Sequence, residues 1–235
     1  MKKIMFNDKY GLTQAVLERT KWKTRRIIPD VHVIRHYNPR LFPENRDPSA
    51  YYRDWRGMCR LINSTGDCIL PKYDIGEIVA VAQSYKECGW GEDVLQETFV
   101  KKPTIFPDID PIDPHVGWID LPFKYHKGWN NKMFVCAELM PYYIDITSIK
   151  AELLQDISDE DCIAEGVIKW MDCYIVAGIM ENRGKNNVCF NTPREAFACL
   201  IDKICGKGTW ESNPFVFVYE FKLVRKKEEW RSIEL

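Results

Sequence analysis

The fold class is decided by residues 192–224, which read Thr192-Pro-Arg-Glu-Ala-Phe-Ala-Cys-Leu-Ile-Asp-Lys-Ile204 and then, after a glycine-containing turn, Asn213-Pro-Phe-Val-Phe-Val-Tyr-Glu-Phe-Lys-Leu-Val224. The first run predicts a helix, because Thr192 can cap it, a proline suits its first turn and a glutamate three residues on completes a capping box. The second run predicts a long strand, since β-branched and aromatic residues dominate it. A helix followed by an aromatic strand therefore indicates a chain of mixed α and β structure.

The remaining elements alternate less regularly than this pair. Strands are expected at 3–6, 74–82, 133–137 and 142–149, and helices at 10–18 and 158–166. Because the strands and helices do not alternate in a regular βαβ order, a mixed β-barrel with peripheral helices is favoured over a doubly wound sheet.

One domain over residues 1–224 is the expected organisation, since no internal repeat and no flexible linker divides the chain. Two proline-rich stretches without a sustained period, about 29–72 and 86–128, are interpreted as insertions. The charged tail 225–235 is expected to fray. The Asp-Pro repeat at 108–114 lacks the glycine and glutamate of a calcium loop, so no metal is assigned.

Composition limits the classes of function. The chain has 46% hydrophobic and 29% charged residues and a net charge of −1, so it lacks the broad positive field that draws proteins to long nucleic acids. Its nine cysteines form no CxxC pair, which argues against a disulfide framework or a zinc site. No apolar run reaches the ~20 residues that span a bilayer, so a cytoplasmic protein without membrane contact and without a cofactor is expected.

A basic segment follows the first predicted helix and is the candidate for chemistry. Lys21, Lys23, Arg25 and Arg26 surround Trp22 there. Guanidinium groups grip phosphate oxygens and an indole ring can stack on a base, so this combination suits phosphate and base binding. The plain alternative is a solvated last helical turn, whose cations balance the negative end of the helix dipole. Further candidate ligand contacts, chosen near strand ends, are Gln83, Tyr85, Trp129 and Lys132.

The segment Arg19-Thr-Lys21-Trp-Lys-Thr24-Arg-Arg26 resembles the signature of the ASCH family, Gly-x-Lys-x-x-Glu-x-Arg. Four further blocks resemble the phage and prophage branch of that family, at 74–81, 128–135, 153–166 and 206–221. The resemblance implies a PUA-like β-barrel with a cleft whose lip carries Lys21, Thr24 and Arg26. It does not extend to the two insertions.

Two positions depart from the family signature. Arg19 replaces its glycine and Thr24 replaces its glutamate. The second change resembles a small ASCH branch that hydrolyses N4-acylated cytidine with a Lys, a Thr and a later Glu. Carried over by motif position, these are Lys21, Thr24 and Glu165, with Glu165 as orienting group or general acid/base. Whether Lys21 would serve as base or as nucleophile stays open.

Three functions follow, in order of preference. The first is binding of RNA or of a modified nucleoside or nucleotide beside the segment Lys21–Arg26. The second is an amidohydrolase that removes an acyl group from N4-acylated cytidine or a similar pyrimidine. The third is a phage accessory protein whose insertions bind a protein partner. Binding ranks first because membership of a fold does not confer chemistry.

Overall fold

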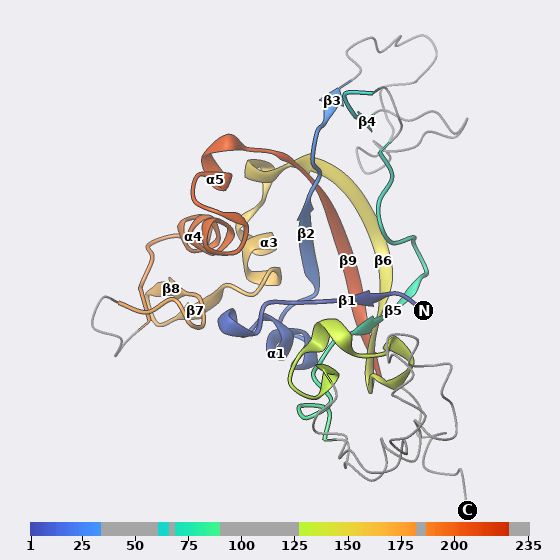
Figure 1. The fold of residues 1–235 in the computed structure, drawn as a ribbon. Helices are drawn as coiled ribbons and strands as arrows, with labels where there is room; N and C mark the ends of the chain where they lie inside the picture. Colours follow the sequence, from blue (N-terminus) through green and yellow to red (C-terminus); the bar gives the residue numbers. More distant parts are fainter. Residues whose placement is uncertain (34–60, 66–68, 90–126, 182–186, 226–235) are drawn as a thin grey trace, which may run out of the picture. The chain divides into compact units, whose positions relative to one another are not determined.

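The computed structural model describes residues 1–33, 61–65, 69–89, 127–181 and 187–225 (Figure 1). The strands are β1 (Lys3–Ile4), β2 (Lys23–Ile27), β3 (His32–Val33), β4 (Leu61–Ile62), β5 (Ile78–Val81), β6 (Tyr142–Leu153), β7 (Ile168–Trp170), β8 (Cys173–Ile175) and β9 (Phe215–Arg225). The α-helices are α1 (Leu12–Leu17), α3 (Asp159–Ala164), α4 (Pro193–Cys205) and α5 (Thr209–Ser212). Short 3-10 helices are η1 (Asp8–Tyr10), η5 (Lys127–Trp129), η6 (Lys132–Phe134), η7 (Ala137–Leu139) and η8 (Leu154–Asp156). The fold is therefore of mixed α and β structure.

Five strands form a mixed sheet with the order β1-β5-β6-β9-β2. The strands β1 and β5 pair in parallel, with Lys3 opposite Ala80, whereas β2 and β9 pair antiparallel, with Thr24 opposite Tyr219. Because β1 and β2 each have a neighbour on one side only, the strands described here form no closed barrel. Two small antiparallel pairs, β3 with β4 and β7 with β8, complete the strand structure.

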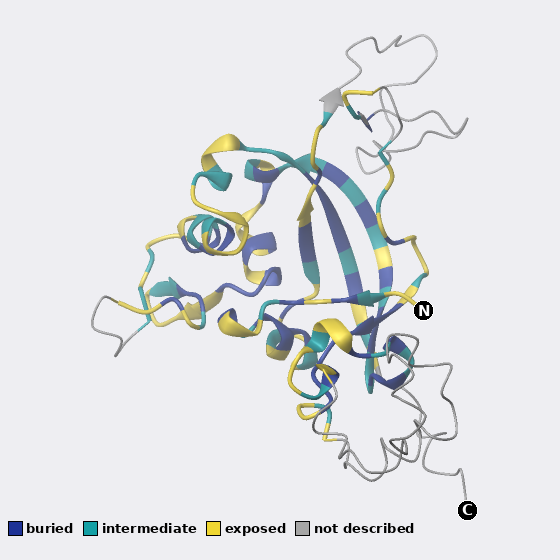
Figure 2. Ribbon diagram, viewed as in Figure 1, coloured by how far each residue is buried: buried dark blue, intermediate teal, exposed yellow. Residues whose placement is uncertain are grey.

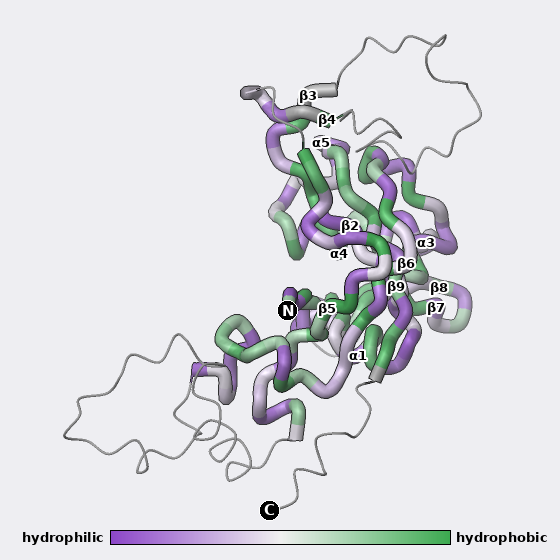
Figure 3. Tube along the Cα trace, turned by 90° about the vertical axis from the view of Figure 1, so that its right-hand side faces the viewer, coloured by the Kyte–Doolittle hydropathy of each residue, from purple (hydrophilic) through white to green (hydrophobic). Residues whose placement is uncertain are grey.

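The chain separates into two compact units, each built from distant segments. The first unit contains residues 1–6, 78–144 and 224–235, and the second unit contains 7–77 and 145–223. A single domain over 1–224 stays a prediction. The hydropathy of the trace alternates in short stretches (Figure 3), and none of the helices in the described ranges is long and apolar enough to cross a membrane.

The core of the first unit forms around β5 and the segment that follows η6. Its buried members are Ala80, Ala82, Tyr85, Val135, Ala137, Leu139, Met140 and Tyr143. The prediction of a strand at 133–137 is wrong, because η6 and η7 occupy this region. The reason is local: the side chain of Asn131 accepts the backbone N–H of Met133 and starts a turn, which an apolar run alone does not reveal.

The second unit contains the helix and most of the strand that were predicted from residues 192–224. The predicted helix is α4, where the Thr192 hydroxyl accepts the N–H of Glu195 and Gly206 follows the last turn. The predicted strand is β9, and β6 alternates between buried and more exposed residues as a sheet strand should (Figure 2). The helix with Ser158 as its N-cap is α3. These local predictions are confirmed.

The basic segment is not the solvated last helical turn that was the plain alternative. From Lys23 onward it is the strand β2, because it pairs along its whole length with β9. Of the insertion at 29–72, the structure describes the paired strands β3 and β4 and short flanking stretches. Most of the insertion at 86–128 and nearly all of the tail 225–235 lie outside the described residues.

Candidate functional site

Backbone hydrogen bonds connect the start of the basic segment to α1, α3 and β9 within the second unit. After α1 the N–H of Lys21 bonds to the carbonyl of Ala15, at 3.0 Å. The N–H of Trp22 then donates to the carbonyl of Ala164, the last residue of α3, at 3.1 Å, and its carbonyl accepts the N–H of Phe221 on β9, at 3.0 Å. These bonds bring Lys21 beside the end of α3, where Glu165 follows.

Lys21 and Glu165 form a buried ion pair. The ammonium donates to Oε2 of Glu165 at 2.6 Å, to the carbonyl of Glu165 at 2.8 Å and to the carbonyl of Lys23 at 2.7 Å. These three acceptors match the three N–H bonds of a lysine ammonium. The two residues are only 2% and 5% exposed. Burial lowers the pKa of Lys21, and the Glu165 carboxylate opposes that shift.

Arg25 joins the same network from β2. Its guanidinium donates to Oε1 of Glu152 and Oδ2 of Asp161, both at 2.6 Å from Nη2, and to Oε1 of Glu165 at 3.2 Å from Nη1. Glu165 therefore bridges Lys21 through one oxygen and Arg25 through the other. Burial opposes ionisation of Arg25, but the three carboxylates outweigh it and raise its pKa.

Lys23 extends the network to the edge of the sheet. Its ammonium lies 2.7 Å from Oδ1 of Asp161 and 2.7 Å from Oε1 of Glu220, and 4.9 Å from the centroid of the Trp22 ring. Asp161 thus lies between two cations. Its partial burial would raise its pKa, but hydrogen bonds from Lys23 and Arg25 lower it below the ordinary value.

Carboxylates balance the charge of the basic segment. Three of its cations, Lys21, Lys23 and Arg25, form salt bridges with four carboxylates, Glu152, Asp161, Glu165 and Glu220, and Glu152 also pairs with Lys150. A polyphosphate would have to compete with these protein carboxylates for Lys23 and Arg25. The segment is therefore much less attractive to a polyanion than its sequence indicates.

Thr24 and Arg26 belong to the other face of β2. Side chains alternate along a strand, so Thr24 projects away from the carboxylates that bind Arg25. Thr24 is buried opposite Tyr219, whose hydroxyl accepts the N–H of Lys72 at 3.0 Å. Arg26 is exposed and stands opposite Phe217. The predicted catalytic residues are thus divided: Lys21 and Glu165 are in contact, and Thr24 lies on an aromatic face.

Tyr73 contributes to this aromatic face. Its ring packs edge-on against Tyr219, with the centroids 5.3 Å apart. Burial raises the pKa of Tyr73 to about 12, so it is a neutral phenol at any ordinary pH. No pattern in the sequence connects Tyr73 with Thr24, because the two residues are 49 positions apart and only the fold relates them.

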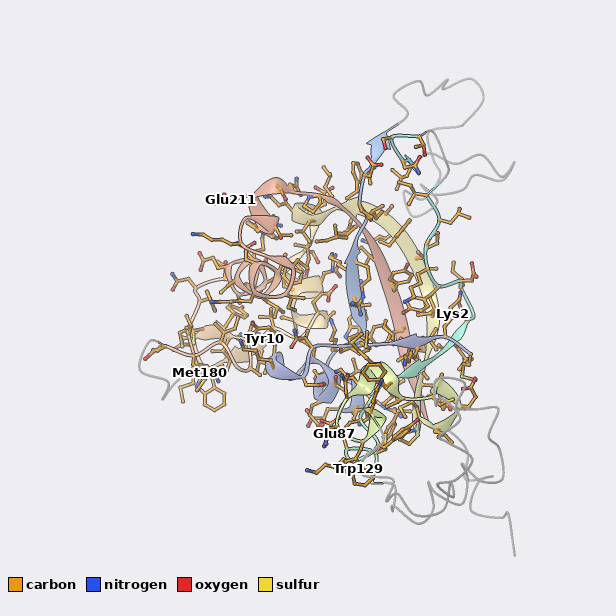
Figure 4. The ribbon with its side chains drawn as sticks, in the orientation of Figure 1. Lys2, Tyr10, Glu87, Trp129, Met180 and Glu211 are labelled. Carbon is orange, nitrogen blue, oxygen red and sulfur yellow. The ribbon has the colours of Figure 1, made fainter. Side chains whose placement is uncertain are left out.

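The other four predicted ligand contacts all belong to the first unit. Tyr85 is fully buried, and its hydroxyl accepts the N–H of Cys136 at 2.8 Å. Its ring therefore packs in the core, where a nucleic-acid base cannot stack on it. Trp129, labelled in Figure 4, packs against that core and is partly buried. Lys132 donates to the carbonyl of Phe6. Gln83 is buried, and its Oε1 has no hydrogen-bond partner among the described residues.

Sequence reasoning missed the acidic half of the network, namely Glu152, Asp161 and Glu220. One available signal was the period of two in Lys21, Lys23 and Arg25, which is typical of one face of a strand and requires an acidic partner when that face is buried.

Comparisons with known proteins name no relative. A scan of protein-family models, a search of curated proteins and a search of solved structures found no match to this chain. In the described part of the chain no group of three or more His, Cys, Asp or Glu side chains could hold a metal ion. The geometry of the site is therefore the basis of any functional statement.

Proposed function

We propose that the second unit binds a nucleoside-like ligand at the segment Trp22–Arg26, on a PUA-like, ASCH-type fold. The observation that carries the proposal is the exposed ring of Trp22 on a rigid backbone. Trp22 is 45% exposed, although its backbone N–H and carbonyl are bonded to α3 and β9. A fixed, exposed indole is a stacking platform for a base.

The charge balance favours a neutral ligand over RNA. Salt bridges to carboxylates occupy Lys23 and Arg25, so few positive charges remain to release counterions from a phosphate chain. A modified nucleoside needs stacking and a few hydrogen bonds instead. Of the two ligands expected from the sequence, the nucleoside fits this site better.

The test compares two exposed tryptophans. Trp22→Ala removes the proposed platform, and Trp170→Ala on β7, where the side chain is 55% exposed, is the matched control. Stacking on an aromatic ring contributes ~1–3 kcal/mol per base, so Trp22→Ala should weaken nucleoside binding by about 5- to 150-fold and Trp170→Ala should not. Cytidine, N4-acetylcytidine and a short RNA would be titrated by calorimetry at two salt concentrations.

The salt series decides between the two ligand classes. Nucleoside affinity that is nearly independent of salt supports the proposal. RNA affinity that falls steeply with salt would instead assign the segment to phosphate contacts. Absence of saturable binding to either nucleoside would remove the proposed function.

A second candidate is the amidohydrolase, favoured by the buried pair Lys21 and Glu165. A lysine whose pKa is lowered by burial is the kind that can act as base or nucleophile, and a carboxylate 2.6 Å away can exchange a proton with it. Incubation with N4-acetylcytidine, with release of cytidine followed by chromatography, tests this candidate. Lys21→Arg, compared by circular dichroism to show that it folds, should abolish turnover; activity that survives in this variant would exclude Lys21 as base or nucleophile.

The third expectation, an accessory protein that binds a partner through its insertions, concerns residues that lie mostly outside the described ranges. Location in the cytoplasm likewise stays a prediction.

A further inference from the structure

A short hairpin of the second unit has an exposed outer strand. It is formed by β7 and β8, which pair antiparallel with Lys169 opposite Tyr174. All three residues of β7 are exposed, and two of them, Ile168 and Trp170, are large and apolar (Figure 2). Neither the ion network nor the platform of Trp22 includes this strand, so its exposure calls for a separate explanation.

The backbone bonds of β8 show which edge of β7 is unpaired. Tyr174 donates its N–H to the carbonyl of Phe190 at 2.9 Å and accepts the N–H of Phe190 at 2.8 Å. In an antiparallel ladder, residues alternate between those that exchange both hydrogen bonds with the residue opposite and those that exchange none. Since Tyr174 uses both groups on Phe190, the N–H and carbonyl of Lys169 point away from β8, to the outer edge of β7. No residue in the described part of the chain is bonded to them there.

The unpaired edge is short, because the chain leaves the extended conformation on both sides of β7. Val167, before the strand, donates its N–H to the carbonyl of Cys162 at 3.2 Å. Met171, after the strand, has a φ of 50°, in the left-handed region, and begins the hairpin turn. The edge therefore offers one donor and one acceptor, both from Lys169, to a partner with an extended backbone.

The side chains at this edge determine the chemistry of the partner. Ile168 and Trp170 lie on one face of β7 and Lys169 lies on the other, because side chains alternate along a strand. Within the described ranges no carboxylate forms a salt bridge with Lys169. Opposite charges and apolar pairs directly across two strands stabilise their pairing. A segment with an acidic residue opposite Lys169 and an apolar residue on each side of it fits this edge.

A second copy of the chain fits the same edge poorly. In a symmetric dimer the two copies of β7 would pair antiparallel. Because Lys169 alone presents both backbone groups, it would stand directly opposite the same lysine of the second copy. Like charges at that position destabilise a strand pair. The charge of the edge therefore favours an acidic partner over self-association.

We propose that the outer edge of β7 binds an extended segment of another protein, in which an acidic residue lies between two apolar ones. The segment pairs antiparallel with β7 and adds a strand to the hairpin. The N–H and carbonyl of Lys169 exchange hydrogen bonds with the backbone of the acidic residue, and its ammonium pairs with the carboxylate. The apolar neighbours of that residue contact Ile168 and Trp170. The inference does not depend on the nucleoside site.

The test titrates the full chain into three fluorescein-labelled peptides and follows fluorescence anisotropy. The first peptide is Thr-Val-Glu-Val-Thr, and the second has lysine in place of its glutamate. The third carries an N-methyl group on the glutamate amide, which removes the backbone donor. The parent should bind the Glu peptide about 5-fold more tightly than the Lys peptide. It should bind the methylated peptide at least about 5-fold more weakly than the unmethylated one.

Charge reversal in the protein provides the matched comparison. Lys169→Glu should prefer the Lys peptide to the Glu peptide. Lys207→Glu changes another exposed lysine of the second unit and should keep the preference of the parent. Trp170→Ala should weaken the binding of both peptides, because it removes apolar contact area. All three positions are exposed, so the circular dichroism of these variants should match that of the parent.

A second measurement locates the contact on the chain. In the free protein the amide of Lys169 should exchange rapidly with solvent, whereas that of Tyr174, bonded to Phe190, should be protected. The Glu peptide should slow exchange at Lys169 and leave Tyr174 unchanged, as followed by NMR. The proposal is overturned if no peptide binds saturably, if Lys169→Glu keeps the preference of the parent, or if bound peptide does not protect Lys169. A dimer that protects Lys169 without any peptide would assign the edge to a second copy instead.

Discussion

The ammonium of Lys21 lies 2.6 Å from Oε2 of Glu165, although 144 positions separate the two residues in the chain. Both residues are buried, and the second oxygen of Glu165 binds Arg25. The contact joins the segment before β2 to the end of α3. Removal of one partner would leave the other as a buried charge with too few partners, which is far more costly than the pair itself.

The first prediction concerns this pair. Lys21→Met should reduce the free energy of unfolding by about 3–5 kcal/mol, the usual cost of breaking a buried ion pair from one side. Urea unfolding followed by tryptophan fluorescence would measure it. Lys169→Met, at an exposed position of β7, is the control and should change stability by less than about 0.5 kcal/mol. Equal midpoints for the two variants would show that the pair is not buried as described.

The second prediction follows from the lowered pKa of Asp161. Because the folded state holds this carboxylate ionised below its ordinary range, the group stabilises the fold above its unfolded pKa, about 4. That stability is lost as the pH falls from about 4 through the lower folded pKa. Asp161→Asn should therefore be less stable than the parent at pH 7, and the difference should shrink below about pH 4.

Urea midpoints at pH 7, 5, 4 and 3 would measure this difference. Asp172→Asn, at an exposed position, should follow the parent at every pH. A difference between Asp161→Asn and the parent that stays constant down to pH 3 would mean that Lys23 and Arg25 do not hold the carboxylate.

Sequence reasoning succeeded where local signals agree with one another. The cap at Thr192, the proline that follows and the apolar period predicted the bounds of α4 almost to the residue. The β-branched and aromatic residues predicted the strand β9. Each signal is a property of neighbouring residues, so no tertiary information is needed. The same reasoning failed at 133–137, where the turn depends on one side chain outside the apolar run, that of Asn131.

Only the cations of the candidate site could be predicted from the sequence; their carboxylate partners could not. The cations of the segment Lys21–Arg26 are visible as a run, but its strand conformation arises from pairing with β9, which is a tertiary effect. Nothing local relates Arg25 to Asp161 or Glu152. The prediction that cations are available for phosphate therefore overlooked the carboxylates that the fold places beside them.

The third prediction concerns Arg19. Arg19 is exposed and has a φ of 63°, in the left-handed region just after the end of α1. A side chain there costs ~1–2 kcal/mol, which glycine avoids, and glycine is the preferred residue at this position of a helix end. Arg19→Gly should therefore raise the free energy of unfolding by about 1 kcal/mol. Arg19→Ala keeps the Cβ atom and should not, so equal urea midpoints for the two variants would contradict this account.

The fourth prediction compares two glycines of the second unit that share a left-handed backbone. Gly178 has a φ of 75° and Gly76 a φ of 80°, so alanine should cost each about 1–2 kcal/mol from the backbone alone. At Gly178 an added Cβ would also lie 2.0 Å from the carbonyl oxygen of Lys9, whereas at Gly76 it would meet nothing within 4 Å. Since a backbone carbonyl cannot rotate away as a side chain can, Gly178→Ala should lose much more stability than Gly76→Ala, or fail to fold. Urea unfolding of both variants measures the difference, and equal losses would show that the segment Asn7–Leu12 does not pack against Gly178.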